Sequence, residues 1–279
     1  MAPQKEELLK ELTALFKSCE GNTVPAGKAL PQCEGLVIFE DPIFGVSRAD
    51  DPIYLTFKEK DVIGDNFLLP AEWLPEARSV ISFFLPFTES VRRSNRGGPE
   101  SISPEWLHGR IEGQACITDF TKKLKSYFES RGSRVCVPAL DARFAVRTTA
   151  LPEGDPKGVH IASNWSERHI AYASGLGTFC LTRGLITAKG VAGRFGSLIV
   201  SEEIEADERP YTGVYDYCIR CGACIRRCPA GAISLEGGKN QIRCKQWMDL
   251  MKKRYAPRYG CGKCQIGVPC ESGIPAGRS

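Results

Sequence analysis

The sequence lacks the features that would place a protein in a membrane or an export pathway. Its 279 residues contain no apolar run approaching 18 residues, the length that a membrane-spanning helix needs. Segment 1–17 instead carries Leu8, Leu9, Leu12 and Leu15 among charged residues, a pattern that predicts an amphipathic helix and not the apolar core of a signal peptide. No twin-arginine export signal is present. We therefore expect a cytoplasmic protein without a membrane partner.

Several other signatures are absent. The chain shows no internal repeat and no low-complexity segment, so the sequence gives no sign of a repeat architecture. It also contains no Walker A motif and no other nucleotide-binding fingerprint. Any redox or transfer chemistry must therefore rest on a different kind of residue.

Cysteine supplies the strongest signal, with 13 residues in the chain. Eight lie near the C-terminus, and the first four follow the spacing C-x2-C-x2-C-x3-C-P that bacterial ferredoxins use for cysteine-ligated 4Fe–4S clusters. Because two cubane clusters need eight thiolates, the count predicts two of them. The predicted ligands are Cys218, Cys221, Cys224, Cys228, Cys244, Cys261, Cys264 and Cys270.

The ferredoxin rule also predicts how these ligands are shared. In two-cluster ferredoxins the lone cysteine of each motif crosses over to the other cluster. The first cluster group is therefore Cys218, Cys221, Cys224 and Cys270. The second cluster group is Cys228, Cys244, Cys261 and Cys264.

Zinc and disulfides are the alternatives for this array. A zinc ribbon uses C-x2-C pairs separated by a longer loop, unlike three tight steps closed by Cys-Pro. Disulfides need an oxidising compartment, and nothing in the sequence exports the chain. The five scattered cysteines are expected to be small buried hydrophobes; they are Cys19, Cys33, Cys116, Cys136 and Cys180.

The charge balance bears on possible partners. The formal net charge is +4, but two oxidised clusters with their eight thiolates would add about −4. A loaded protein would then be close to neutral, which argues against strong general affinity for nucleic acid.

The pattern upstream of the cysteines predicts a mixed α and β fold. The nearly continuous apolar run 78–86 is typical of a central strand covered on both faces, and the long helix predicted over 105–131 leads to another strand at 134–138. This order suggests a right-handed crossover. A helix capped by Ser166 and a last strand over 196–201 follow. We place a domain boundary in the acidic linker behind that strand, giving domains 1–205 and 206–279.

Three segments together resemble one protein family. They are the strand 77–85, the helix and turn 166–177 with the segment 178–201 behind it, and the cysteine array. Their order and spacing over about residues 35–270 look like epoxyqueuosine reductase and its relatives, including the catalytic core of reductive dehalogenases. Compared with that family, the chain would be a short, divergent branch without the C-terminal helical repeats that help to grip tRNA.

The resemblance implies an α+β fold in which a nitroreductase-like α/β domain is followed by a two-cluster bacterial ferredoxin-like domain. It further implies a cobalamin in the first domain, with electrons passing to cobalt from the nearer cluster. The turn at Gly175, Leu176, Gly177 and Thr178 would lie against the corrin ring, since a glycine turn allows close backbone approach.

Other candidate site residues follow from the same comparison. The family's aspartate general acid is replaced by Ile111, so Glu112 and His108 are the candidate proton donors. They lie four residues apart and share a helical face, although an ordinary solvated pair has the same spacing. His169 could face the cofactor or be a hydrogen-bonded helix residue. Arg143 and Arg147 could meet the cofactor rim or lie on the surface.

These features predict an iron–sulfur oxidoreductase that uses cobalamin for reductive chemistry on a small or modified substrate, in a pocket built from the loops 41–70 and 141–165. A ferredoxin or flavodoxin would donate the electrons. A nucleic-acid substrate is doubtful, because both the family's aspartate and its helical tail are missing. Two alternatives remain open: a non-catalytic carrier that delivers electrons to a separate corrinoid protein, and a flavin-dependent reductase.

Overall fold

A four-stranded antiparallel sheet forms the centre of the molecule. The computed structural model describes residues 3–277, and the strand order is β1-β2-β8-β3. The bounds are Ile43–Arg48 for β1, Ser79–Pro86 for β2, Val135–Cys136 for β3 and Gly193–Val200 for β8. Since β2 and β3 both pair antiparallel with β8, they run parallel to each other on its two sides, as a strand–helix–strand crossover requires.

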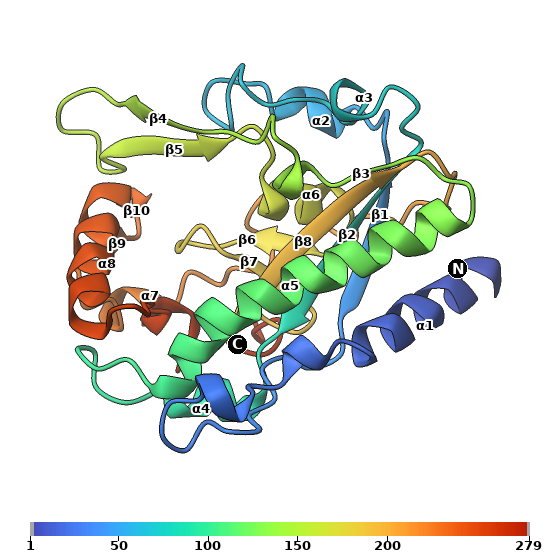
Figure 1. Cartoon of the computed structure of the whole chain (residues 1–279). Helices are drawn as coiled ribbons and strands as arrows, with labels where there is room; N and C mark the ends of the chain where they lie inside the picture. The colour runs from blue at the N-terminus through green and yellow to red at the C-terminus, as the bar shows by residue number, and fades with distance from the viewer. Residues whose placement is uncertain (1–2, 278–279) are drawn as a thin grey trace.

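Helices cover both faces of this sheet (Figure 1). Helices α1 (Pro3–Lys17) and α5 (Pro104–Ser130) lie over one face, and α6 (Glu167–Ala173) lies on the other. Strand β2 is buried along its whole length. Its alternate side chains enter two separate apolar clusters, Ile81 with the α1 and α5 side and Val80 with the α6 side. The expected central strand is confirmed.

Local chemistry explains the long helix α5. Ser103 caps its N-terminus by accepting a hydrogen bond from the Trp106 backbone N–H at 3.2 Å, and Pro104 occupies the first turn, where a missing N–H costs nothing. Gly109 stands where a Cβ atom would come within 2.8 Å of the Phe87 ring. The glycine therefore lets the helix approach the sheet closely.

Two expectations about the chain path are wrong. The segment 41–70, expected to be an irregular excursion, forms the edge strand β1 at its start. Gly45 within that strand has its missing side chain directed at the Ser174 carbonyl, so this glycine marks a close backbone approach. The irregular stretch expected over 141–156 contains strand β4 (Val146–Ala150), which pairs with β5 (Val159–Ser163) as an outlying hairpin.

Except for the 15-residue helix α8, the remaining elements are short. The upstream ones are η1 (Glu20–Asn22), η2 (Ala26–Lys28), α2 (Ile53–Thr56), α3 (Pro70–Trp73), α4 (Glu89–Ser94), η3 (Pro138–Leu140), β6 (Gly177–Phe179) and β7 (Leu185–Thr187). The C-terminal ones are α7 (Ala223–Arg226), β9 (Ile233–Ser234), β10 (Gly238–Lys239), α8 (Gln241–Tyr255) and η4 (Lys263–Gln265). No helix among the described residues 3–277 is long and apolar enough to cross a bilayer.

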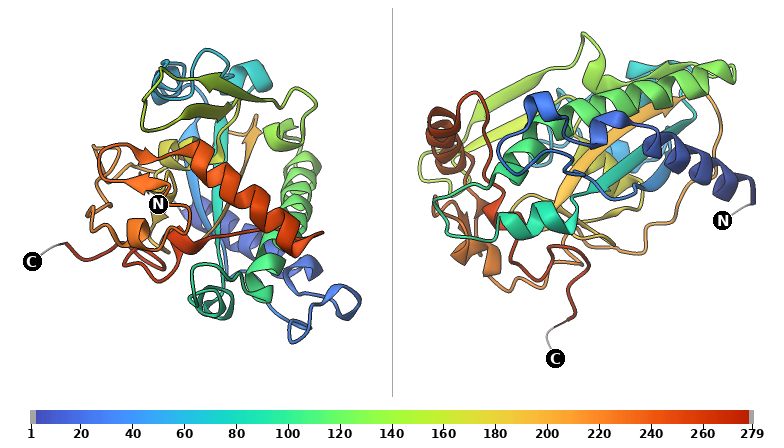
Figure 2. Two further views of the ribbon diagram at one scale, coloured as in Figure 1. Left: turned by 90° about the vertical axis from the view of Figure 1, so that its left-hand side faces the viewer. Right: turned by 60° about the horizontal axis from the view of Figure 1, so that its bottom comes forward.

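The cysteine-bearing C-terminal part lies at the end of the sheet where β8 begins (Figure 2). Backbone hydrogen bonds attach it there: Val191 N–H donates to the Cys270 carbonyl at 2.9 Å, and Ala192 N–H to the Glu271 carbonyl at 3.2 Å. The buried Glu271 carboxylate also pairs with Arg96 at 2.5 Å. The two parts of the chain are therefore held in contact by the same residues that bring Cys270 back to the sheet.

Candidate functional site: two groups of cysteines beside a cationic cluster

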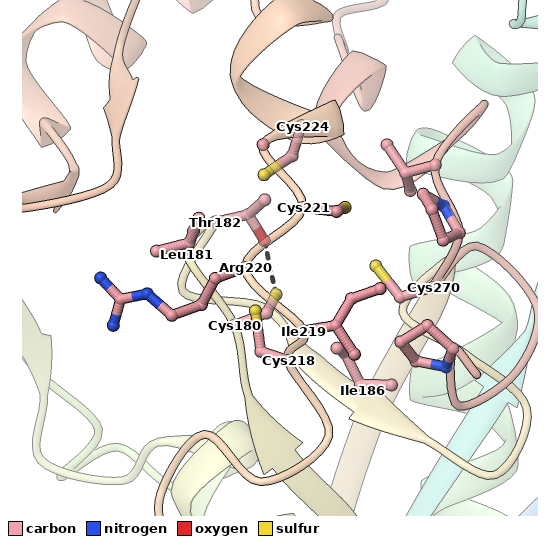
Figure 3. Close-up of a pocket in the computed structure, with 14 residues that line it drawn as sticks. Cys180, Leu181, Thr182, Ile186, Cys218, Ile219, Arg220, Cys221, Cys224 and Cys270 are labelled. Carbon is pink, nitrogen blue, oxygen red and sulfur yellow. Dashed lines mark hydrogen bonds between the residues drawn. The ribbon is translucent and has the colours of Figure 1, made fainter. Parts of the chain in front are cut away.

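The first cluster group lines one pocket. Figure 3 shows its four sulfurs, three from the run 218–224 and one from Cys270, with a fifth thiol, Cys180, beside them. Cys180 comes from the turn between β6 and β7 in the upstream part of the chain. The rest of the lining includes the apolar side chains of Leu181, Ile186, Ile219 and Val268.

Strand β6 and the turn after β7 hold both ends of this group in place. The Tyr217 backbone N–H donates to the Thr178 hydroxyl at 2.9 Å, which fixes the chain directly before Cys218. Between Cys221 and α7, Gly222 takes φ +72°, a left-handed conformation that favours glycine. The turn at Gly222 leads directly into α7, which carries Cys224.

The second cluster group forms next to the first. Burial, together with the neighbouring thiols Cys261, Cys244 and Cys228, raises the pKa of Cys264 to about 12 against the opposing charge of Lys239. The pKa of Cys224, in the first group, is likewise raised to about 12, mainly by burial and then by Cys180 and Cys264. Because Cys264 of the second group acts on Cys224 of the first, the two groups adjoin.

The donor chemistry of each group fits an iron–sulfur cluster. Four half-buried cysteines per group provide the four thiolates that a cubane uses, and cluster binding would release the protons that burial keeps on these thiols. Within residues 3–277, no three His, Cys, Asp or Glu side chains are arranged to ligate a single metal ion. The ligands of a cubane bind four different irons and need not meet at one ion.

Three cations lie beside the second group; we call Arg168, Arg183 and Lys239 the cationic cluster. Arg168 is exposed to solvent, yet burial lowers the pKa of its guanidinium. Arg168 also donates to the Arg183 carbonyl at 2.5 Å, and burial lowers the pKa of Arg183 as well.

Within the cationic cluster, Lys239 lies nearest to thiols of the second group. Burial acts to lower the pKa of its ammonium group, but the charges of Cys264 and Cys244 outweigh that effect and leave the pKa raised. Arg168 acts on the same ammonium group in the opposite direction. Arg168 therefore lies within electrostatic reach of both Arg183 and Lys239, and Lys239 within reach of the second group, an arrangement that suits an anionic ligand.

His169 lies next to Arg168 on α6 and faces aromatic rings. Its Nδ1 is 2.8 Å from the Ser166 hydroxyl, and its ring packs at 4.8 Å from Phe179 and 5.2 Å from Phe57. Ser166 is the N-cap residue of α6, as expected, but its hydroxyl bonds His169 instead of the helix backbone. Burial lowers the pKa of His169 to about 3, so the imidazole is neutral. Its predicted contact with a cofactor stays a prediction.

The predicted glycine turn packs against the protein itself. A Cβ at Gly175, where φ is +79°, would come within 2.6 Å of the Glu208 carbonyl. A Cβ at Gly177 would overlap the Ile186 carbonyl in the β6–β7 hairpin. Leu176 is buried between them. These contacts account for both glycines, so a role for the turn in binding a corrin ring stays a prediction.

His108 and Glu112 belong to a closed ionic network. His108 is fully buried, its Nε2 accepts the Leu30 backbone N–H at 3.0 Å, and its Nδ1 is 2.9 Å from the Glu112 carboxylate. Nδ1 therefore carries the proton. Arg258 binds both carboxylate oxygens, at 2.5 and 2.7 Å, and donates to the Lys28 carbonyl. This structural role uses every polar side-chain atom of His108 and Glu112 and competes with the predicted proton donation.

Arg143 and Arg147 lie apart from the cysteines. Arg143 pairs with Asp141 at 2.8 Å, donates to the Glu72 and Trp73 carbonyls, and covers the Trp73 ring at 4.8 Å. Arg147 is exposed on β4. The structure therefore gives Arg143 a local structural task, and the predicted contact of either arginine with a cofactor stays a prediction.

Sequence reasoning did not single out Glu167, Cys180, Arg168 or Lys239. Of these four residues, Glu167 could have been suspected from the sequence, because it lies two positions before the predicted site residue His169 on α6. Its Oε2 accepts the Ser197 hydroxyl at 2.6 Å, whereas its buried Oε1 has no partner. Burial raises the pKa of Glu167 to about 7. The other three are brought to the site only by folding.

Comparison with known proteins supports the iron–sulfur assignment and the predicted resemblance. Residues 211–234 match the family model described as a 4Fe-4S binding domain. Epoxyqueuosine reductase from Staphylococcus aureus is 27% identical over 218 residues, covering 72% of this chain and 50% of that protein. The enzyme of the same name from Listeria monocytogenes is 27% identical over 133 residues, covering 44% and 34%. The chain thus spans about half or less of these relatives.

The structure of a reductive dehalogenase supports the overall fold. A catabolic reductive dehalogenase matches 98% of this chain and 37% of its own, with a TM-score of 0.52 and 14% identity. Epoxyqueuosine reductase from Streptococcus thermophilus matches 99% and 67%, with a TM-score of 0.48 and 18% identity. Another epoxyqueuosine reductase was solved with an epoxyqueuosine-modified tRNA stem loop. Our doubt about a nucleic-acid substrate finds no support in these comparisons.

Proposed function

We propose that this chain, which is similar to epoxyqueuosine reductases in sequence and to a reductive dehalogenase in fold, is an iron–sulfur oxidoreductase. Domain 206–279 would hold two 4Fe–4S clusters, and domain 1–205, of nitroreductase-like type, would hold a cobalamin. The observation that carries this proposal is the adjoining pair of four-cysteine groups, with the cationic cluster beside the second.

The order of the two groups suggests an electron path. The first group lines a pocket whose neighbourhood includes the exposed side chains Arg220 and Tyr215, so a ferredoxin or flavodoxin could dock there. Cys224 and Cys264 connect the groups. The second group then faces Lys239 and Arg168, where a redox-active organic ligand would receive the electrons.

The cationic cluster and the residues next to it suit the proposed cofactor. Cobalamin carries a phosphate, which the paired cations Arg168 and Lys239 can neutralise. The neutral His169 and the Phe179 ring beside it offer an apolar wall. When bound and reduced, cobalamin supplies a strong nucleophile and reductant. Residues of this chain would bind and shield it, and Glu167, with its raised pKa, could hold a proton nearby.

The substrate would be a small or modified molecule, and the similarity to epoxyqueuosine reductases makes a modified RNA nucleoside one such case. A second reading is a non-catalytic electron carrier. It is favoured by one observation: the predicted proton donors His108 and Glu112 are engaged in a structural network. A flavin reductase is a third reading, since a flavin nucleotide also carries phosphate.

Anaerobic titration of the reconstituted protein with cobalamin tests the proposal. We expect changed corrin absorption bands and about one cobalt per chain, whereas unchanged bands would remove the cobalamin mechanism and a flavin spectrum would support the third reading. Arg168→Ala should weaken cobalamin binding by about ten- to hundredfold, because a charge-assisted hydrogen bond is worth roughly 1.5–3 kcal/mol. The exposed Arg134→Ala, next to β3, is the matched control and should leave binding unchanged.

A further inference from the structure

The pocket of the first cluster group holds five thiols, one more than a 4Fe–4S cluster needs. The additional thiol belongs to Cys180, which is 4% exposed and lies on the turn between β6 and β7. Figure 3 shows it beside the sulfur of Cys218. Cys218 and Cys270 both pack against the small apolar cluster of Cys180, Ile186 and Val191.

The charges place Cys180 close to three of the four expected ligands. It exerts the largest effect of any charged neighbour on the pKa of Cys224 and of Cys270. Cys218 in turn raises the pKa of Cys180, after burial, which is the main cause.

The local backbone holds this sulfur in position. The Thr182 hydroxyl lies 3.1 Å from Sγ of Cys180, and the Gly184 carbonyl lies 3.4 Å from it. The Thr182 oxygen accepts the Gly184 N–H at 3.1 Å, so its own hydrogen is available for the Cys180 sulfur. A Cβ at Gly184 would come within 2.9 Å of that hydroxyl oxygen.

We propose that Cys180 is a replacement ligand for the first cluster, able to take over the iron held by Cys218. The exchange balances without any oxidant: the bond from iron to Cys218 breaks, a bond from iron to Cys180 forms, and the proton of the Cys180 thiol passes to Cys218. The number of thiolates on the cluster stays at four. This inference rests on the proposed function, because it requires a cluster in this pocket.

Iron and sulfide analysis of anaerobically reconstituted variants tests the exchange. Wild type and Cys180→Ala should each bind about eight irons per chain, because four regular ligands remain for each cluster. Cys218→Ala should also keep about eight, with an altered EPR signal from the first cluster. The double variant Cys218→Ala/Cys180→Ala should fall to about four. Cys221→Ala is the matched control, because Cys221 is not among the residues that pack against the apolar cluster of Cys180, and it should fall to about four by itself.

The second cluster serves as an internal check on folding, since its four cysteines are untouched. Cys218→Val, which has no atom able to ligate iron, gives the same comparison, alone and combined with Cys180→Ala, should the alanine variant not fold. The proposal is overturned if both Cys218 variants lose as much iron as the corresponding double variants while the second cluster stays intact. A wild-type protein with no cluster in this pocket would overturn the proposed function as well, so the two failures are distinguishable.

Discussion

Replacing Glu112 by Gln separates a structural role for this residue from a catalytic one. The Glu112 carboxylate is 12% exposed and Arg258 is 13% exposed, and their two hydrogen bonds measure 2.5 and 2.7 Å. Removing one partner of a buried ion pair costs about 3–5 kcal/mol, because it leaves the other charge buried and uncompensated. At about 2 °C per kcal/mol for a chain of this size, the unfolding midpoint should fall by roughly 6–10 °C.

The assay is anaerobic thermal unfolding of the loaded protein, followed by circular dichroism and by cluster absorbance. The double variant Glu112→Gln/Arg258→Met should recover most of the lost stability, since it removes the stranded charge as well. Iron content and any reductive turnover should survive in the folded variant. Full stability together with complete loss of turnover would refute this reasoning and restore Glu112 as the proton donor.

The same network predicts sensitivity to acid. Burial acts to raise the pKa of Glu112, but the hydrogen bonds from Arg258, the backbone and His108 outweigh it and leave the pKa lowered. The ionised carboxylate therefore stabilises the fold at any pH above the usual glutamate pKa of 4.5. This contribution is lost as the pH falls through the lowered pKa of the folded state. Burial also lowers the pKa of His108 below its usual value of 6.5. Below pH 6.5 the imidazole therefore binds a proton more readily in the unfolded chain than in the folded one, and the free energy of unfolding decreases.

Two further predictions concern other buried positions. The raised pKa of Glu167, about 7 against a usual 4.5, means that the folded protein binds more protons between these values, so stability should fall with rising pH by up to about 1.4 kcal/mol per unit. Glu167→Gln should abolish that slope in denaturation midpoints measured from pH 5 to 8, and an unchanged slope would contradict the assignment. Gly109→Ala should destabilise the fold by about 1–3 kcal/mol, because the added methyl meets the Phe87 ring. Gly98→Ala, which meets nothing within 4 Å, is its control, and equal midpoints for the two variants would count against this packing.

The cysteine array was readable from sequence because cluster ligation imposes a local spacing. The crossing rule of two-cluster ferredoxins assigns the isolated Cys244 and Cys270 to opposite groups, and this division stays a prediction. In the structure Cys244 lies near Cys264, and Cys270 lies near Cys224 and Cys218. The central strand β2 and helix α5 could also be predicted from the sequence. An unbroken apolar run indicates a strand buried on both faces, and an apolar stripe at helical spacing indicates a helix buried on one face. These signals depend on neighbours close in sequence.

What the sequence could not show depends on contacts between distant segments. His108 and Glu112 displayed only helical spacing, and Arg258, which engages both carboxylate oxygens, lies 146 residues further on. Cys180 had no cysteine near it in sequence and joins the first group only through the β6–β7 turn. Gly45 was read as a breaker, although it lies within a strand where another backbone approaches.

Iron and acid-labile sulfide analysis of the anaerobically reconstituted wild-type chain, combined with EPR of its reduced form, tests the central claim most directly. Two adjoining cysteine groups predict about eight irons and eight sulfides per chain, with an EPR spectrum broadened by interaction between two reduced centres. A yield of about four irons with a single, isolated signal would contradict the assignment of the second cluster group.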